Sequence, residues 1–330
     1  MNLTERYSKK LETTVNGQQI SLDGVLLQLE VTNACNHKCM FCPNVESHRP
    51  KKMIDFELAR NMIAMGARAT GVVPIDTVHI NVHDLEDLER NLIISKKLGY
   101  EYSFITTNGS LANEELLTRL FEAGLDSIKF SINAGSRETY KKIHGVDNYE
   151  NAINALKFSW KYREENGKKY KIFVSCVGIK QNYEELEAFN QMASCYCDEV
   201  VFYYPCGYAG QKLASLEDRC DLSKLSVKSF EIRHTVPCAV LWNSINVTCE
   251  GYLSLCCSES DNRLIVEDIN HIGVKEAWLG EKMMTIREKH AKMNIEEMPC
   301  LSCVTETPYD ITKIDKHLFA LSLQNTKEML

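Results

Sequence analysis

Three cysteines in the first fifty residues have the spacing of metal ligands. Cys35, Cys39 and Cys42 directly follow an apolar run, with three and then two residues between them, so one loop can bring their thiols together. A [4Fe–4S] cluster has four irons, and three thiolates leave one iron without a protein ligand and open to chemistry. Spacing alone leaves two other interpretations: unrelated cysteines of the core or surface, and part of a structural zinc site, which normally closes with a nearby fourth ligand such as His37 or His48.

A second group of cysteines lies in the last third of the chain. Between Cys238 and Cys256 polar and apolar residues alternate, and this pattern predicts a β-hairpin over 244–256. A helix is expected over 275–289. Four thiols gathered by a hairpin and a closely spaced pair can fully ligate an iron–sulfur cluster or a zinc ion. The cysteines concerned are Cys238, the neighbours Cys256 and Cys257, and the pair Cys300 and Cys303.

Apolar, β-rich runs alternate with helical segments between these two groups. Each predicted strand reaches the next through a crossover helix, which implies a parallel α/β sheet with right-handed connections. Periodicity alone does not distinguish a barrel from a doubly wound sheet. In barrels functional residues gather on the loops that leave the strands, and the first three cysteines stand on such a loop. The strands are expected over 26–31, 77–82, 101–106, 126–132, 171–179 and 199–204, and the helices over 55–69, 85–98, 113–123, 136–143, 149–166 and 183–195.

The cysteine spacing at 35, 39 and 42, with the aromatic Phe41 just before the third cysteine, resembles the signature of the radical S-adenosylmethionine (SAM) superfamily. The resemblance implies that the three cysteines ligate a [4Fe–4S] cluster, that SAM chelates the open iron, and that Phe41 lies beside the adenine. One electron from the cluster then cleaves SAM to methionine and a 5′-deoxyadenosyl radical. The implied fold is α/β, an incomplete (β/α)6 TIM-like barrel open to substrate at one side.

Polar residues near the ends of later strands also resemble those that hold SAM in this superfamily. Asn108 follows the third strand, Ser131 and Asn133 end the fourth, and Ser175 lies on the fifth. Their hydroxyl and amide groups can hydrogen-bond the ribose or the methionine part of SAM. Turn or cap roles are the alternative for each of them.

One segment departs from the pattern of the superfamily, which usually carries a Gly-Gly-Glu-Pro-like turn after the second strand to hold the SAM amine. Residues 78–87 contain neither a glycine pair nor a Glu-Pro dipeptide. We expect Asn81, His83 or Asp84 to supply an acceptor instead, His83 only in its neutral form. The alternative is that these residues form a solvated turn.

The C-terminal cysteines resemble the SPASM extension of radical SAM enzymes, in its shortened twitch form. Twelve residues separate Cys238 from Gly251 and four separate Gly251 from Cys256, the order characteristic of that extension. The resemblance implies one auxiliary [4Fe–4S] cluster, with zinc as the alternative. Cys249 and Cys257 remain as candidate hydrogen-atom donors to a substrate radical, or as buried structural cysteines. The ligands implied are Cys238, Cys256, Cys300 and Cys303.

Composition and charge set the broad class of protein. The 330 residues are 44% hydrophobic and carry a net charge of −7, without the basic excess that binding to nucleic acid or to an anionic membrane surface requires. The chain has no signal-peptide pattern and no long apolar run, so we expect a soluble, cytoplasmic protein with reduced thiols. The expected organisation is an N-terminal extension 1–23, a radical SAM partial barrel 24–205, a linker 206–237, a small α+β auxiliary-cluster domain 238–305 and a helical tail 306–330.

The function implied by two clusters is radical abstraction of hydrogen from a small polar, carbohydrate- or aminocyclitol-like substrate. The expected reaction is alcohol dehydrogenation, with the auxiliary cluster as electron acceptor and an external one-electron reductant such as flavodoxin or ferredoxin. Sugar epimerisation with a cysteine donor, radical modification of a ribosomally made peptide, and a non-enzymatic iron–sulfur electron carrier are the alternatives. Candidates for the general base lie near strand ends: His79, His83, Asp84 and Tyr204.

Overall fold

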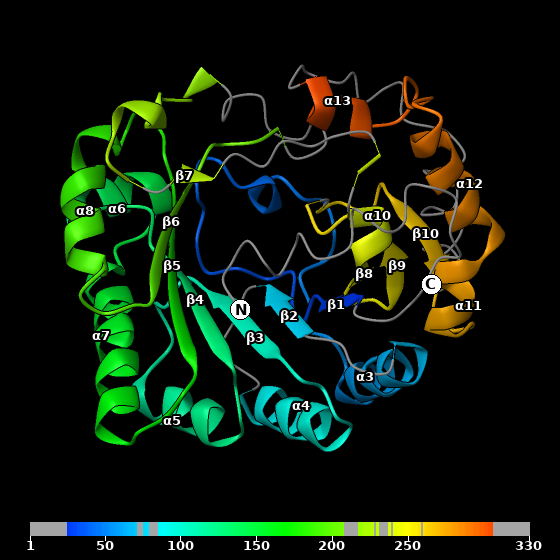
Figure 1. Cartoon of the computed structure of the whole chain (residues 1–330), viewed down its shortest axis with the longest axis horizontal. Helices are drawn as coiled ribbons and strands as arrows, with labels where there is room; N and C mark the ends of the chain where they lie inside the picture. The colour runs from blue at the N-terminus through cyan, green and yellow to red at the C-terminus, as the bar shows by residue number, and fades with distance from the viewer. Residues whose placement is uncertain are drawn as a thin grey trace.

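The structure is a computed structural model of the whole chain. A single sheet organises the molecule, in the order β10-β9-β8-β1-β2-β3-β4-β5-β6-β7 (Figure 1). The structure describes residues 25–70, 75–78, 85–207, 217–227, 229–230, 237–238, 240–258 and 260–305. The strands are β1 (Leu26–Leu29), β2 (Ile75–Val78), β3 (Ser103–Thr107), β4 (Ser127–Ser131), β5 (Lys171–Val177), β6 (Glu199–Tyr203), β7 (Ser229–Phe230), β8 (Ser244–Val247), β9 (Tyr252–Ser254) and β10 (Ile265–Asp268).

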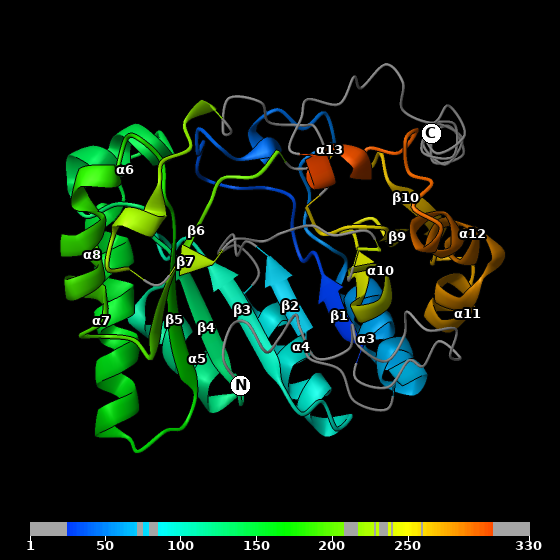
Figure 2. The same cartoon turned by 45° about the horizontal axis from the view of Figure 1, so that its top comes forward.

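Neighbouring strands from β1 to β7 pair in parallel, and helices cover the outer face of the curved sheet (Figure 2). This arrangement confirms the expected partial (β/α)6 barrel. The barrel helices are α3 (Phe56–Thr70), α4 (Leu85–Lys97), α5 (Glu114–Glu122), α6 (Arg137–His144), α7 (Tyr149–Glu165) and α8 (Leu186–Ala193). The C-terminal helices are α10 (Val240–Asn243), α11 (Val274–Leu279), α12 (Glu281–Ala291) and α13 (Cys300–Thr305), and the 3-10 turns are η1 (Pro43–Val45), η3 (Tyr183–Glu185) and η4 (Leu222–Lys224).

Helix α5 illustrates how the sequence sets the limits of an element. The side chain of Asn113 accepts a hydrogen bond from the Leu116 amide at 2.9 Å and so caps the first turn. The helix ends before Gly124, whose φ of +96° is the left-handed conformation that glycine adopts without strain. Both limits lie where the sequence predicted them.

Several elements differ from the expected ones. Strand β7 and the turn η4 lie in the expected linker 206–237, β10 was not expected, and the helix expected over 183–195 begins as the 3-10 turn η3. Strand β2 (Ile75–Val78) begins two residues earlier than expected, and the rest of the expected strand lies outside the described residues. The single helix expected over 275–289 is two helices, α11 and α12, because Gly280 adopts extended backbone between them with φ −68° and ψ 163°. A Cβ at Gly280 would lie 2.9 Å from the Glu276 carbonyl oxygen, so the close approach at this break requires glycine.

The C-terminal cysteine region shares the sheet of the barrel. Strand β8 pairs in parallel with β1, with Leu26 opposite Ser244 and Gln28 opposite Asn246. Strands β9 and β10 then add antiparallel to β8, and α11 packs against α3. The loop that leaves β1 therefore lies directly beside the hairpin β8–β9.

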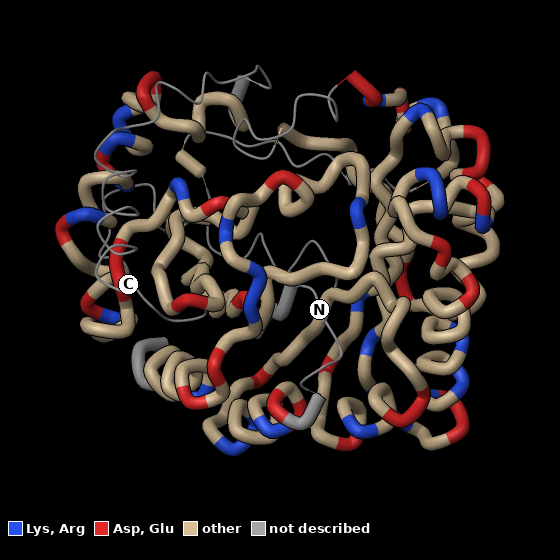
Figure 3. Tube along the Cα trace, turned by 180° about the vertical axis from the view of Figure 1, so that it is seen from behind, with Lys and Arg blue, Asp and Glu red and all other residues tan. Residues whose placement is uncertain are grey.

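Apolar side chains fill the space between the sheet and the outer helices, whereas several side chains on the inner face are polar. One apolar cluster joins β1 and β8–β10 to α3, α11 and α12, and another joins β3–β6 to α5–α8. Lys/Arg and Asp/Glu residues are interspersed over the outer elements (Figure 3). None of the described helices combines the length and the apolar character that crossing a bilayer requires. The expected segments 1–23 and 306–330 lie outside the described residues.

Candidate functional site

The loop that carries the first three cysteines is fixed by the C-terminal end of α6. The amides of Lys38 and Met40 donate to the carbonyl oxygens of His144 and Ile143, at 2.9 and 3.0 Å. The last carbonyls of a helix have no partner within the helix, so these bonds satisfy both the helix end and the loop. The chain can turn away beside Lys38 because Gly145 has a φ of +69°.

Substitution Gly145→Ala is expected to destabilise the fold by about 1 to 3 kcal/mol, the usual cost of a non-glycine residue in a strained backbone conformation. The new Cβ would lie 3.2 Å from Lys38 Cβ and 3.3 Å from its carbonyl oxygen, which pushes on the cysteine loop. Urea unfolding and iron retention measure the two effects. Gly167→Ala is the matched control, because Gly167 also has a positive φ, +59°, and a Cβ there meets nothing within 4 Å.

The thiols of Cys35, Cys39 and Cys42 converge on one point of this loop. Burial raises the pKa of Cys39 well above its usual value, and the neighbouring sulfurs of Cys42 and Cys35 raise it further. Burial also raises the pKa of Cys35. Sulfurs this close repel one another as thiolates unless a cation lies between them, so the donor set fits an iron–sulfur cluster held by three thiolates.

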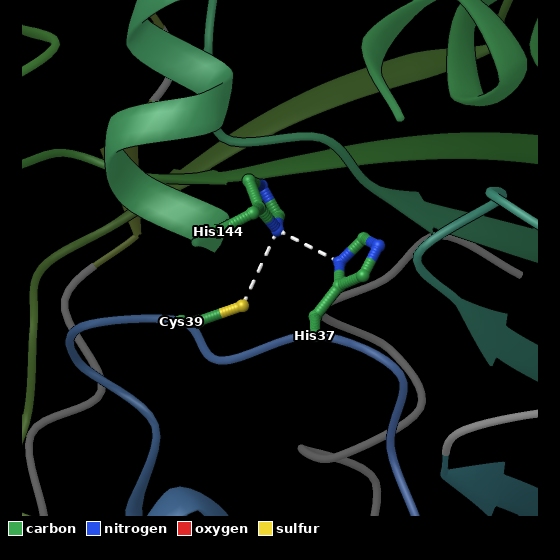
Figure 4. Close-up of side chains that lie close together, drawn as sticks. All are labelled: His37, Cys39 and His144. Carbon is green, nitrogen blue, oxygen red and sulfur yellow. Dashed lines mark hydrogen bonds between the residues drawn. The ribbon is translucent and has the colours of Figure 1, made fainter. Parts of the chain in front are cut away.

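Two buried histidines stand beside Cys39 (Figure 4). Nε2 of His144 lies 2.7 Å from the Ile132 carbonyl oxygen, which only accepts, so this nitrogen carries the proton. Nδ1 of His144 lies 3.2 Å from the Cys39 sulfur and 3.1 Å from Nδ1 of His37. Burial lowers the pKa of His144 to about 4, so the ring is neutral at pH 7. It orients the Cys39 side chain without adding charge.

A cavity of about 370 Å³ opens between the cysteine loop, the inner face of the barrel and the C-terminal hairpin. Its wall includes sulfurs from both cysteine groups, since Cys35, Cys39, Cys42, Cys256 and Cys257 all line it. The two groups, more than 200 positions apart in sequence, therefore face one space. Other lining residues are Gln28, Glu30, Arg49, Thr106, Lys129, Tyr203, Asn246, Thr248, Ser254 and Ser258.

The candidate SAM-binding residues that the structure describes all line this cavity. Phe41 is buried against Ile143 and Ile179. The hydroxyl oxygens of Ser131 and Ser175 lie 3.2 Å apart on adjacent strands β4 and β5.

Two asparagines of that set already make hydrogen bonds within the protein. Asn108 donates from Nδ2 to Asn36 Oδ1 at 2.9 Å. Asn133, with φ +61°, accepts from the Val177 amide at 2.8 Å and joins the ends of β4 and β5. The remaining candidates, Asn81 and His83, lie with His79 and Asp84 outside the described residues.

The second group of thiols converges in the C-terminal region. Burial raises the pKa of Cys300 well above its usual value, and the sulfurs of Cys256, Cys238 and Cys303 raise it further, in that order. Burial and the nearby Cys256 raise the pKa of Cys238 to about 11. Four partly buried sulfurs that perturb one another in this way suit a closed four-thiolate site.

The two candidate hydrogen donors occupy different environments. Cys257 is exposed and lines the cavity. Cys249 is fully buried beside Arg49, Glu30 and Glu250, and it is not among the residues that line the cavity. Burial, Glu30 and Glu250 raise the pKa of its thiol. Tyr204, a candidate base, lies under the Arg219 guanidinium, 4.7 Å from the ring centre, and is not among the lining residues either.

Several cavity residues were not singled out from the sequence, among them four on the strands. Lys129 and Tyr203 point inward from β4 and β6, with Lys129 Nζ 5.9 Å from the centre of the Tyr203 ring. Gln28 and Asn246 are register partners on β1 and β8. The alternation of polar and apolar residues in Ser127–Ser131 and Ser244–Val247 marks such inward positions, but in sequence it equally suits a solvent-facing strand.

Comparisons with known proteins agree with this arrangement. The family model for the Radical SAM superfamily matches residues 29–193, which is half of the chain, and the model for the SPASM iron–sulfur cluster-binding domain matches residues 238–304. A probable GTP 3′,8-cyclase of Saccharolobus solfataricus is 27% identical over 317 residues, which cover 82% of this chain and 96% of the relative. An uncharacterised protein of Methanocaldococcus jannaschii is 26% identical over 243 residues, which cover 72% of this chain and 77% of that protein.

Solved structures share the fold at low sequence identity. Streptococcus suis SuiB bound to S-adenosylmethionine has a TM-score of 0.61 at 15% identity, over 80% of this chain and 68% of SuiB. BtrN in complex with AdoMet and 2-DOIA has a TM-score of 0.55 at 15% identity, over 88% of this chain and 98% of BtrN.

These matches cover both cysteine groups that the structure gathers around one cavity. The Radical SAM match implies SAM and a [4Fe–4S] cluster, and the SPASM match implies auxiliary iron–sulfur chemistry. This chain therefore belongs to the radical SAM superfamily, as an enzyme that carries a C-terminal SPASM iron–sulfur domain.

Proposed function

We propose that this radical SAM enzyme dehydrogenates an alcohol carbon of a small polar, carbohydrate- or aminocyclitol-like substrate. The observation that carries the proposal is the cavity of about 370 Å³, because sulfurs of both cysteine groups line it. A substrate there lies near both clusters, so a radical formed at one side can lose an electron at the other. In this proposal the radical cluster is held by Cys35, Cys39 and Cys42, and one auxiliary cluster by Cys238, Cys256, Cys300 and Cys303.

The bound cofactors supply a 5′-deoxyadenosyl radical and a one-electron acceptor. The protein's part is to orient both reactants. The hydroxyls of Ser131 and Ser175 are assigned to SAM, and Phe41 to its adenine. With these groups bound, the substrate carbon would lose a hydrogen atom, its hydroxyl would lose a proton to a base, and the auxiliary cluster held by Cys238, Cys256, Cys300 and Cys303 would supply the acceptor for the remaining electron. The substrate thus loses two hydrogens and two electrons, and an external reductant such as flavodoxin or ferredoxin starts each cycle.

The charge on the cavity wall favours a substrate of low charge. Among the described lining residues the cations are Arg49 and Lys129, and Arg49 already pairs with Glu30 and Glu250. A nucleoside triphosphate normally requires several cations or backbone amides around its phosphates. Likeness to a probable GTP 3′,8-cyclase makes GTP the second candidate substrate. The paired state of Arg49 argues against it.

The proposal is tested with protein whose clusters have been reconstituted anaerobically, incubated with SAM and dithionite. An enzyme releases 5′-deoxyadenosine, and an electron carrier releases none. A panel of cyclitols, aminocyclitols and hexoses, with GTP and a peptide library as further arms, is then screened by mass. A product lighter by two hydrogens supports the proposal. Unchanged mass with deuterium uptake from water would indicate epimerisation instead, and turnover of GTP or of a peptide would replace the proposed substrate class.

A further inference from the structure

Arg49 joins the cysteine loop of the barrel to the C-terminal hairpin. Its side chain is 4% exposed and forms two-pronged ion pairs on both sides. Toward β1, Nη1 donates to Glu30 Oε1 at 3.0 Å and Nη2 to Oε2 of the same carboxylate. Toward the hairpin turn, Nε donates to Glu250 Oε1 at 3.0 Å and Nη2 to Oε2 at 2.6 Å. One guanidinium thus holds carboxylates from both parts of the protein.

The two residues before Arg49 make further contacts with the C-terminal region. Ser47 Oγ donates to the Ser260 carbonyl oxygen at 2.7 Å. The His48 amide donates to Asp261 Oδ1 at 2.6 Å, and His48 Nδ1 lies 3.0 Å from Oδ2. We call Ser47, His48 and Arg49, with Glu30, Glu250, Ser260 and Asp261, the interdomain clasp.

The clasp lies close in sequence to both cysteine groups. Ser47 comes five positions after Cys42, and Asp261 comes five positions after Cys256. Glu30 also accepts from the Cys249 amide at 3.0 Å, beside the turn of the hairpin that ends at Cys256. Since clasp residues stand on the same short loops as the cysteines, ordering of either loop by a bound cluster also orders the clasp.

We propose that the interdomain clasp couples the two cysteine sites, so that a cluster bound at one site slows the loss of the cluster at the other. Coupling between sites requires a connecting element that both sites bias, and the clasp is such an element. Arg49 is a positioning residue in this scheme, because it acts through the loops. The coupling concerns cluster retention and holds whichever reaction the enzyme catalyses.

The test measures how fast reduced, reconstituted protein loses its SAM-responsive EPR signal in excess EDTA, since this signal reports the three-cysteine cluster alone. The double variant Cys300→Ala/Cys303→Ala, which removes two thiols of the auxiliary site, is expected to lose the signal at least about fivefold faster than the wild type, the lower end of usual coupling strengths. In an Asp261→Ala background, which removes the His48 contacts and keeps the Arg49 pairs, the same pair of substitutions is expected to change the rate by a smaller factor than in the wild type.

Asp261→Ala carries the test because Asp261 stands at the edge of the clasp and its loss leaves no buried carboxylate. Arg49→Met is the stronger disruption, and removal of one partner of a buried ion pair can unfold the protein. Lys168→Met is the matched control, because it breaks an exposed pair with Glu122 of α5, outside the clasp and the cysteine loop, and is expected to keep the fivefold effect. Equal loss rates with and without the auxiliary cysteines, or an undiminished effect in the Asp261→Ala background, would overturn the proposal.

Discussion

Substitution Cys39→Ala is expected to reduce the yield of 5′-deoxyadenosine by more than about 100-fold, since loss of even the outer partners of metal ligands costs about 10- to 100-fold. Burial raises the pKa of Cys39 well above its usual value, and its thiol is the one that faces His144. Two remaining thiolates cannot hold the cluster with one open iron for SAM. The yield is measured by chromatography after reconstitution with iron, sulfide, SAM and dithionite.

The control for this prediction is Cys195→Ala. Cys195 is exposed beyond the end of α8, and its thiol donates a hydrogen bond to the Gln191 carbonyl oxygen at 3.4 Å. We expect this variant to cleave SAM at the wild-type rate. Substantial cleavage by Cys39→Ala would mean that another group completes the cluster site, and the assignment of the three cysteines would then fail.

The sequence predicted the barrel well because its signals are local. Strand and helix patterns, the Asn113 cap and the Gly124 stop each depend on residues within a few positions of one another. The spacing of Cys35, Cys39 and Cys42 is local too, and it led to the family that the comparisons establish. The break at Gly280 was missed because the apolar periodicity runs through it, although the close approach to Glu276 leaves no room for a side chain.

The relation between the two cysteine groups could not be predicted from the sequence. It depends on the pairing of β8 with β1, in which Leu26 lies opposite Ser244. Most of the sequence separates these two residues, so no local pattern predicts the pairing. The same pairing creates the clasp, yet Glu30, Arg49 and Glu250 each look like ordinary surface residues in sequence. Cys249 is buried and Cys257 is exposed, and the spacing of the cysteines in the sequence does not predict this difference.

Substitution Cys256→Ala is expected to lower the iron content from about eight to about four atoms per chain, whereas Cys257→Ala is expected to leave it unchanged. The closed auxiliary site takes all four ligands from the protein, and no cofactor covers an iron that loses its thiolate there. The two cysteines are adjacent, but only Cys256 perturbs the pKa of Cys300 and Cys238. Iron and sulfide analysis with Mössbauer spectroscopy measures the difference, and each variant serves as the matched control for the other. Loss of iron in Cys257→Ala alone would exchange the assignments.

The same pair of variants separates oxidation from epimerisation. If the auxiliary cluster accepts the substrate electron, Cys256→Ala still cleaves SAM but stops forming the oxidised product, and Cys257→Ala turns over normally. If a cysteine returns a hydrogen atom to the substrate radical, the exposed, cavity-lining Cys257 is the better placed donor, and Cys257→Ala would cleave SAM and accumulate no epimer. Product formation by Cys256→Ala at the wild-type rate would contradict the proposed route of the electron.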